Sequence, residues 1–312
     1  MKAVIFPGQG SQVVGMGKAL ADAIPAARDV FREVDEAIGE NLSRIMWEGP
    51  EDQLTLTENA QPALMAVSIA VLRALEAEHG LDLKEKFTYA AGHSLGEYTA
   101  LCATGVLSLA ETAKLLKIRG RAMQAATPVG SGAMAALLGL DLETVSAVAK
   151  DAAQGGVCQA ANDNAPGQVV ISGDSAAIDR AIDLAKERGA KRAIKLAVSA
   201  PFHCALMQPA ADAMEEALAD VVFQTPSIPI ISNVQAGPVS DPEALKALLV
   251  DQVTGMVRWS ESITALKGLG VDTLVELGAG KVLSGLARRI DREMTALNAG
   301  TPEDIEILIS NL

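Results

Sequence analysis

The segment from residue 87 to residue 97 reads FTYAAGHSLGE, and its pattern decides the fold class. Residues 87–91 form an apolar run typical of a buried strand, and a helix is expected from Glu97 onward. Between them, Gly92-x-Ser94-x-Gly96 has the form of a nucleophile elbow, a sharp strand-to-helix turn that lifts a serine hydroxyl clear of a sheet. This pattern predicts an α/β fold with Ser94 as a catalytic nucleophile. A glycine-rich turn without a catalytic role is the alternative, because the chain contains 27 glycines.

The composition agrees with an α/β protein that can bury a sizeable core. Of the 312 residues, 49% are hydrophobic, 21% are charged and only 3% are aromatic. Few aromatics favour helices packed on a sheet over an all-β sandwich, whose strands rely on aromatic and β-branched side chains. A chain of this length forms one large domain, or a large domain that carries a smaller one.

Further patterns extend this interpretation along the chain. A buried strand is expected at residues 2–6, and helices at residues 26–38 and 62–78. Ser108-Leu109-Ala110-Glu111 is a capping box that starts a long helix reaching about Ala126. Beyond residue 198, short strands and helices alternate at residues 228–231, 245–252, 260–269, 273–276 and 282–290.

Residues 128–197 show a different order of elements. The expected order is a strand at 133–138, a helix at 142–153, strands at 157–161 and 168–172, a helix at 175–188 and a strand at 192–198. A βαββαβ order over this length matches a ferredoxin-like unit. We therefore expect a large α/β-hydrolase-like domain, formed by residues 1–127 and 198–312, with an inserted small ferredoxin-like α+β domain at residues 128–197.

Charge and cysteine content exclude several classes of protein. The formal net charge is -13, which argues against nonspecific nucleic-acid binding because that needs lysine and arginine against phosphate. Three cysteines without paired spacing, and no paired histidines, predict neither a disulfide framework nor a metal site. Residues 2–6 are too short for a signal peptide, and no stretch is expected to span a bilayer. We therefore expect a cytoplasmic protein with no nucleic-acid or membrane partner.

A serine nucleophile needs a base, and the chain has only three histidines. His79 lies at a helix end among charged residues, where a solvated role is expected. His93 neighbours Ser94, and because successive side chains at a turn diverge, we expect it to line the site. His203 lies in a loop after a predicted strand, where active-site residues commonly sit, so elimination makes it the candidate base. A purely structural histidine is the alternative.

The helix that starts at Ser108 places its cations on two different faces. A stripe with i, i+3, i+7 spacing, interpreted as a solvated basic face, comprises Lys114, Lys117 and Arg121. Arg119 lies instead on the apolar side, where an arginine is costly unless it meets an anion. Its partner is either a buried Asp or Glu, or a substrate carboxylate held through two parallel hydrogen bonds.

Two nucleotide-binding motifs fail on inspection. Gly8-x-Gly10 lacks the third glycine of a dinucleotide fingerprint, and the run from Gly10 to Gly15 has Met16 where a phosphate loop requires lysine. Neither motif therefore predicts a nucleotide cofactor.

Six segments run in order through the chain: FPGQGSQ (6–12), GHSLGE (92–97), RGR (119–121), NAPGQ (164–168), PFH (201–203) and ELGAGKVL (276–283). Together they strongly resemble the malonyl-CoA:acyl carrier protein transacylases of the acyltransferase domain family. The matches extend from residue 6 to about residue 290, so they cover nearly the whole chain.

The resemblance implies a ping-pong transfer of malonyl from coenzyme A to the phosphopantetheine thiol of acyl carrier protein, in fatty acid biosynthesis. Malonyl-CoA is then a substrate, acyl carrier protein is the partner, and no cofactor is expected. The roles carried over by position are the nucleophile (Ser94), the general base and then acid (His203), the oxyanion-hole N–H groups (Gln9 and Leu95), the malonate clamp (Arg119), the carbonyl that orients the histidine (Gln252), and residues lining the substrate site (His93 and Phe202).

Phe202 is a departure, because many bacterial members have a smaller residue there. Its bulk resembles malonyl-selective relatives and is expected to exclude an α-methyl branch. The resemblance also implies an acidic carrier, and the candidate basic patches for docking it are Lys191-Arg192, Arg288-Arg289 and the stripe on the helix from Ser108.

Two alternative functions are weighed against the transacylase. A serine hydrolase or thioesterase of the α/β-hydrolase type also carries Gly-x-Ser-x-Gly, but it orders its residues Ser, acid, His, with the histidine late. Here a small domain intervenes between Ser94 and His203, no histidine follows, and Arg119 has no obvious role in such an enzyme. A non-catalytic relative is disfavoured by the intact serine, histidine and arginine.

Overall fold

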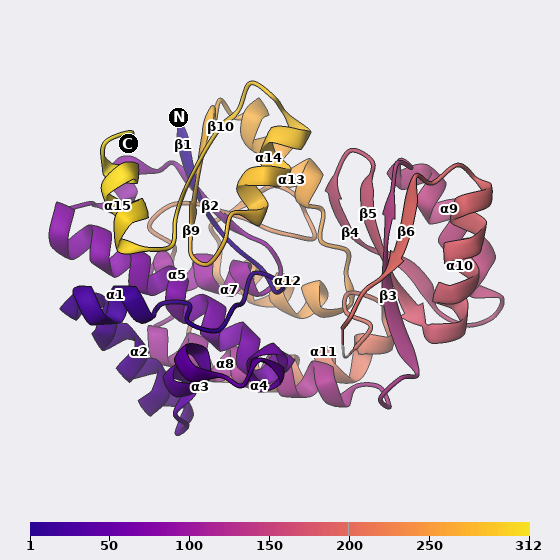
Figure 1. Cartoon of the computed structure of the whole chain (residues 1–312), viewed down its shortest axis with the longest axis horizontal. Coiled ribbons are helices and arrows are strands. Elements are labelled where there is room, and N and C mark those ends of the chain that lie inside the picture. Colours follow the sequence, from indigo (N-terminus) through magenta and orange to yellow (C-terminus); the bar gives the residue numbers. More distant parts are fainter. Residues whose placement is uncertain (199) are drawn as a thin grey trace.

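A six-stranded sheet forms the centre of the computed structural model, which describes residues 1–198 and 200–312 (Figure 1). Five strands are parallel, and the edge strand β8 pairs antiparallel with β7. In spatial order they are β10 (Thr295–Ala299), β9 (Thr273–Leu277), β1 (Lys2–Phe6), β2 (Tyr89–Gly92), β7 (Ile230–Ile231) and β8 (Pro238–Val239). The predicted α/β class is confirmed.

Both faces of this sheet are buried, as parallel sheets require. Successive side chains of β1 point to opposite faces, so Val4 and Phe6 join one apolar core while Ala3 and Ile5 join another. The second core is closed by α13 (Trp259–Gly268) and α14 (Val282–Ile290). The first is closed by the larger group of helices, among them α2 (Pro25–Ile38), α5 (Thr57–His79), α7 (Leu95–Ala103) and α8 (Leu109–Ala125).

Shorter helices connect these layers. They are α1 (Lys18–Ala23), α3 (Leu42–Glu48), α4 (Glu51–Thr55), α6 (Leu83–Lys86), the 3-10 helix Ala205–Met207, α11 (Gln208–Ala219), α12 (Pro242–Thr254) and α15 (Pro302–Ile309). The predicted capping box of α8 is confirmed, because Ser108 and Glu111 each bond the other's backbone N–H.

A second sheet lies beside the first and has its own helices (Figure 1). Its elements follow the predicted βαββαβ order: β3 (Gly132–Leu138), α9 (Leu142–Ala153), β4 (Cys158–Ala165), β5 (Gln168–Asp174), α10 (Ser175–Glu187) and β6 (Arg192–Lys195). The strands are antiparallel in the order β4-β5-β3-β6, and α9 and α10 cover them around a separate apolar core. Ser199, in the predicted return to the large domain, lies outside the described residues.

Helix α5 corrects two expectations. It begins at Thr57 rather than at residue 62, because the polar residues Asn59 and Gln61 that interrupt the apolar pattern are buried and hydrogen-bonded to α8. It is also long and apolar enough to cross a membrane, contrary to the expectation that no stretch is. Of its most apolar window, 83% is buried inside the protein, so packing in the core accounts for its composition.

The predicted solvated basic face on α8 is wrong for Lys117, while Lys114 and Arg121 are exposed as expected. Lys117 is 5% exposed, and its Nζ lies 2.6 Å from Glu40 Oε2 and 2.9 Å from Asn59 Oδ1. Arg121 bonds Glu58 and Glu40, each at 2.7 Å. Glu40, after α2, and Glu58, on α5, therefore pair with Lys117 and Arg121, and these ion pairs hold α8, which carries Arg119, against its neighbours.

Candidate active site

The turn between β2 and α7 is possible only with glycine on both sides of Ser94. A Cβ on Gly92 would lie 1.9 Å from the carbonyl oxygen of Gly96, and a Cβ on Gly96 would lie 2.3 Å from that of Phe6. Ser94 itself has φ 54° and ψ -109°, a conformation that side-chain-bearing residues rarely adopt. Strain of this kind persists where the surroundings hold the residue in place, and it clusters at functional sites.

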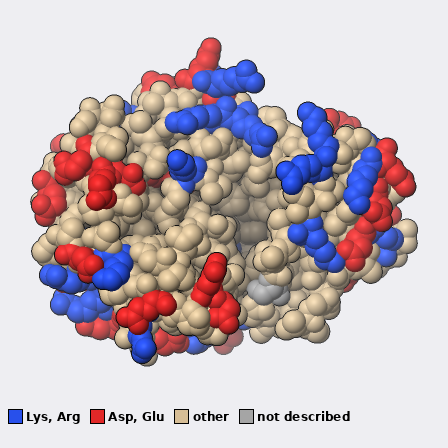
Figure 2. Space-filling view, in the orientation of Figure 1, with Lys and Arg blue, Asp and Glu red and all other residues tan. Residues whose placement is uncertain are grey.

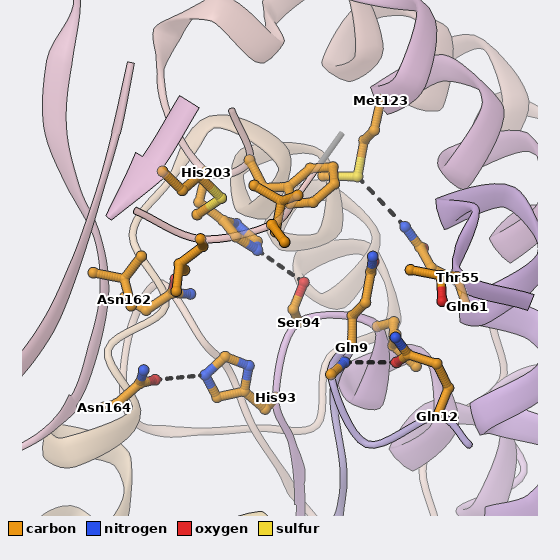
Figure 3. A pocket seen from close by; sticks show the side chains of 18 of the residues that line it. Gln9, Gln12, Thr55, Gln61, His93, Ser94, Met123, Asn162, Asn164 and His203 are labelled. Atoms are coloured by element: carbon orange, nitrogen blue, oxygen red, sulfur yellow. Dashed lines mark hydrogen bonds between the residues drawn. The ribbon is translucent and has the colours of Figure 1, made fainter. Parts of the chain in front are cut away.

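His203 meets Ser94 across 109 residues of sequence. Its Nε2 lies 2.8 Å from Ser94 Oγ (Figure 3). Its Nδ1 lies 2.9 Å from the backbone oxygen of Gln252. A carbonyl oxygen only accepts, so Nδ1 carries the proton and Nε2 is free to accept the serine proton. A backbone carbonyl thus occupies the place of the carboxylate in a Ser-His-Asp triad.

The imidazole of His203 is held neutral by its surroundings. Burial and, to a smaller extent, the nearby Arg119 guanidinium lower the pKa of His203 from 6.5 to about 3. The ring is therefore uncharged at neutral pH, which is the form that a general base requires.

This lowered pKa predicts a stability difference between the wild-type protein and His203→Gln. Below pH 6.5 the unfolded chain binds a proton on His203 and the folded chain does not, so acid favours unfolding of the wild type. We expect the wild-type free energy of unfolding, minus that of His203→Gln, to fall by about 1.4 kcal/mol per pH unit between pH 6 and pH 5. Urea unfolding at both pH values measures it. The comparison is needed because burial raises the pKa of Glu97 to about 7, which acts in the opposite direction. An unchanged difference would show that His203 titrates normally in the folded protein.

Arg119 lies in the interior beside the nucleophile. It is 1% exposed, and its guanidinium donates to Gln61 Oε1 at 2.8 Å, Gln252 Oε1 at 2.8 Å and Ser94 Oγ at 3.0 Å. Its Nε has no hydrogen-bond partner among the described residues. All three acceptors are uncharged, so the buried Asp or Glu salt bridge left open by the sequence is not found within the described chain. Glu97 attracts the guanidinium electrostatically but is joined to it only through Gln252. The guanidinium can therefore still bind an anionic ligand directly.

A cavity of about 360 Å³ opens in front of these groups, between the two sheets. Figure 2 shows the hollow near the middle of the molecular face, and Figure 3 shows the side chains around it. The large layer contributes Gln9, Gln61 and Met123, and the small sheet contributes Asn162 and Asn164. The cavity therefore offers a mostly neutral wall with one buried cation at its base.

The remaining predicted residues lie around the same cavity. His93 lines the cavity as predicted. Its ring points away from Ser94, and its Nε2 lies 2.8 Å from Asn164 Oδ1 (Figure 3). Phe202 and Gln9 also line it. Leu95 is the first residue of α7, whose N–H has no acceptor within the helix. His79 instead contacts Glu306 of α15.

Sequence reasoning missed three polar residues of this site. Gln61 holds Arg119, Asn233 accepts the Ser94 N–H at 2.7 Å, and Glu97 contacts both Gln252 and Asn233. Glu97 could have been noticed, because a carboxylate three residues after a nucleophile lies on the first turn of the following helix. Asn233 and Gln252 carry no local signal.

The chain is similar to known proteins over nearly its full length. Residues 4–293 match the model of the acyl transferase domain. The malonyl CoA-acyl carrier protein transacylase of Bacillus subtilis is 46% identical over 99% of this chain and 96% of its own. A crystal structure of an acyl-carrier-protein S-malonyltransferase from Bartonella henselae is 56% identical, with a TM-score of 0.97, and covers 99% of this chain and 98% of its own.

A third similar structure contains a partner. It holds a type II PKS acyl-carrier protein in complex with its malonyl-transacylase, is 40% identical with a TM-score of 0.96, and covers 100% of this chain and 99% of its own. Sequence and structural similarity thus agree over almost every residue. The chain belongs to the acyl transferase domain family, among the malonyl CoA-acyl carrier protein transacylases.

Proposed function

We infer that this protein transfers the malonyl group from malonyl-CoA to the phosphopantetheine thiol of an acyl carrier protein, as an acyltransferase of fatty acid biosynthesis. The names of its relatives support this activity. The observation that carries it is the position of Arg119, a buried guanidinium that no carboxylate of the described residues contacts directly, 3.0 Å from Ser94 Oγ. A plain hydrolase has no need for a cation there, whereas an acyl group with a free carboxylate does.

The first half-reaction forms a malonyl ester on Ser94. Ser94 Oγ attacks the thioester carbonyl carbon while its proton passes to His203 Nε2, which lies 2.8 Å away. The carbonyl oxygen becomes an oxyanion that accepts hydrogen bonds from the N–H groups of Gln9 and Leu95; one such donor contributes about 3 kcal/mol in comparable enzymes. The carbon–sulfur bond then breaks, and His203 protonates the departing coenzyme A thiolate.

The second half-reaction reverses these steps with a new thiol. The phosphopantetheine thiol gives its proton to His203 Nε2 and attacks the ester carbonyl, and Ser94 leaves with that proton. Gln252 holds the Nδ1–H of His203 throughout, so the ring keeps one tautomer. Arg119 holds the malonyl carboxylate in both steps through paired hydrogen bonds. No step requires a cofactor, and we propose that none is used.

The architecture supports a finer classification. We infer that the large layer is α/β-hydrolase-like, because a parallel sheet presents Ser94 at a strand-to-helix turn. We infer that residues 128–197 form a ferredoxin-like domain inserted between residues 1–127 and 198–312, because that segment has its own antiparallel sheet and core. The basic pairs Lys191-Arg192 and Arg288-Arg289 stay candidate carrier contacts, and the cytoplasmic location stays a prediction.

Phe202 is proposed to select malonyl over branched acyl groups. It lines the cavity next to His203 and is 9% exposed, so an α-methyl branch would compete with its ring for space. We expect Phe202→Ala to raise the kcat/KM for methylmalonyl-CoA relative to malonyl-CoA by about 10- to 200-fold, the range for a pocket that distinguishes one methyl group. Competition between the two thioesters measures the ratio. An unchanged ratio would assign the selection to other residues.

A comparison of the rates of malonyl transfer and malonyl-CoA hydrolysis distinguishes a transacylase from a serine hydrolase. The protein is incubated with radiolabelled malonyl-CoA, with and without holo acyl carrier protein. We expect label on the protein alone, and its passage to the carrier thiol when the carrier is added. Release of free malonate faster than transfer, with carrier present, would support the serine hydrolase instead.

A further inference from the structure

Glu97 is a buried carboxylate that the reaction above does not use. It is 1% exposed and lies in the first turn of α7, three residues after Ser94. Its hydrogen-bond partners are uncharged: Oε2 accepts from Gln252 Nε2 at 2.7 Å and from the Asn233 N–H at 3.2 Å. A carboxylate withdrawn from water is costly, and each of these partners leads directly to the reacting groups.

Gln252 connects Glu97 with all three groups proposed for catalysis and substrate binding. Its side-chain Nε2 also donates to the Ser94 carbonyl at 3.0 Å, and its Oε1 accepts from Arg119 Nη2 at 2.8 Å. Its backbone oxygen accepts from His203 Nδ1 at 2.9 Å. A shift of Gln252 would therefore move the nucleophile, the base and the clamp together.

Glu97 supplies the shorter of the two bonds that hold the Gln252 amide nitrogen, the other being to the Ser94 carbonyl. An ionised carboxylate only accepts hydrogen bonds, and a guanidinium only donates them. The amide nitrogen must therefore face Glu97 and the amide oxygen must face Arg119. Without Glu97, the amide nitrogen keeps only the longer bond to the Ser94 carbonyl, so the amide is held less tightly and Arg119 has a less fixed acceptor.

Asn233 connects Glu97 with the strained turn. Its Oδ1 accepts the Ser94 N–H at 2.7 Å, and its Nδ2 donates to the Gly92 carbonyl at 2.7 Å. These two bonds hold the two peptide groups that lead into Ser94, whose φ is 54°. By accepting the Asn233 N–H, Glu97 fixes the backbone from which both bonds are made.

We propose that Glu97 is a positioning residue for malonyl transfer, which aligns His203 and Arg119 through Gln252 and the Ser94 turn through Asn233. This inference rests on the proposed function. Glu97 thus supports His203 as the acid of a catalytic triad does, but it acts through Gln252 and does not contact the imidazole ring.

The test compares two buried carboxylates. Glu97→Met keeps the side-chain length and removes the acceptor, and Glu276→Met makes the same change in β9, where Glu276 is 0% exposed and accepts the N–H groups of Leu283 at 3.1 Å and Ser284 at 2.7 Å. Assays at pH 8.5 keep Glu97 ionised, since burial raises its pKa to about 7 against the opposing effects of Gln252, Asn233 and Arg119. Both variants are corrected for their folded fraction by thermal unfolding.

We expect Glu97→Met to lower the kcat/KM for malonyl-CoA by about 10²-fold, the scale of a small misplacement of reacting groups. The malonyl-to-acetyl ratio is expected to fall about tenfold, because Arg119 loses a fixed partner. Glu276→Met is expected to keep the wild-type ratio. Glu97→Gln retains an acceptor oxygen and is expected to stay within about tenfold of wild type in malonyl transfer.

Histidine NMR gives a readout that a merely structural role would not move. The chain has three histidines, so a ¹⁵N-histidine spectrum contains three rings, and His203→Gln identifies the signal of His203. In the wild type and in Glu276→Met, His203 is expected to be neutral with its proton on Nδ1. In Glu97→Met, that proton is expected to exchange faster and the ring to populate both tautomers.

The proposal would be overturned if Glu97→Met had the same malonyl-to-acetyl ratio and the same His203 NMR signal as Glu276→Met. If Glu97→Met does not fold, Glu97→Asp decides, because it keeps the charge and withdraws the oxygen by one methylene; the same fall in ratio is expected, and a wild-type ratio overturns the proposal. Failure of the wild-type protein to transfer malonyl would refute the proposed function instead, and the His203 spectrum would then decide the role of Glu97.

Discussion

Replacing Ser94 by alanine is expected to lower malonyl transfer by about 10⁴-fold or more, because no covalent intermediate can form. The remaining rate would come from the oxyanion donors and from the bound substrates alone. Stopped assays with radiolabelled malonyl-CoA and holo carrier protein measure the rate, and gel analysis measures label on the protein. The label on the protein is expected to vanish while the transfer rate falls to this residual level, because the ester on Ser94 is the intermediate of the reaction.

Thermal unfolding is the control for this variant. Alanine carries a Cβ like serine, so the strained turn at φ 54° is neither relieved nor worsened. The variant is therefore expected to fold and to keep its affinity for malonyl-CoA. A Ser94→Ala protein that still accumulates labelled ester would place the nucleophile elsewhere.

Replacing Arg119 by alanine is expected to lower the kcat/KM for malonyl-CoA by about 10²–10³-fold, the scale of losing one partner of a buried charged pair. Acetyl-CoA has no carboxylate, so its transfer is expected to stay constant or to rise. The rise has a physical reason: Arg119 Nη2 donates to Ser94 Oγ at 3.0 Å, and removing it frees that oxygen for attack. Side-by-side kinetics with both thioesters measure the change in ratio.

Arg119→Lys sharpens this comparison. Lysine keeps the charge but cannot form the paired hydrogen bonds of a guanidinium, and it cannot reach Gln61, Gln252 and the substrate at once. We expect the kcat/KM of Arg119→Lys for malonyl-CoA to lie between the values of the wild type and of Arg119→Ala. Parallel losses of acetyl and malonyl transfer in both variants would mean that Arg119 supports the fold rather than the substrate carboxylate.

Much of the fold could be predicted because its signals are local. The capping box at Ser108, the buried strand β1 and the βαββαβ order of the small sheet depend on residues a few positions apart. Errors arose where tertiary contacts replaced local preference. Helix α5 begins before its expected start because buried amides interrupt its apolar pattern. Lys117 is buried because the carboxylates of Glu58 and Glu40, 59 and 77 residues away, pair with it.

The site divides along the same line. Gly92 and Gly96 predict the turn at Ser94 from the sequence, and the structure explains them, since a Cβ at either position would clash with a backbone carbonyl. Helical periodicity places Arg119 inward but leaves its partner open, and only the structure shows that three uncharged groups receive it. His203 followed from the scarcity of histidines, while its contact with Ser94 is a fact of packing.

By itself the sequence determined the α/β class, the strained serine and the inward arginine, because backbone sterics and the 3.6-residue period act within one or two helical turns. The tertiary structure decided which groups meet: Gln252 approaches Ser94 across 158 residues, and Glu97 approaches Gln252 across 155. Such contacts follow from how whole elements pack around two sheets, and no local preference specifies them. For this reason residues 87–97 were enough to predict the turn at Ser94, whereas the contacts of Glu97 with Gln252 and Asn233 could be found only in the folded structure.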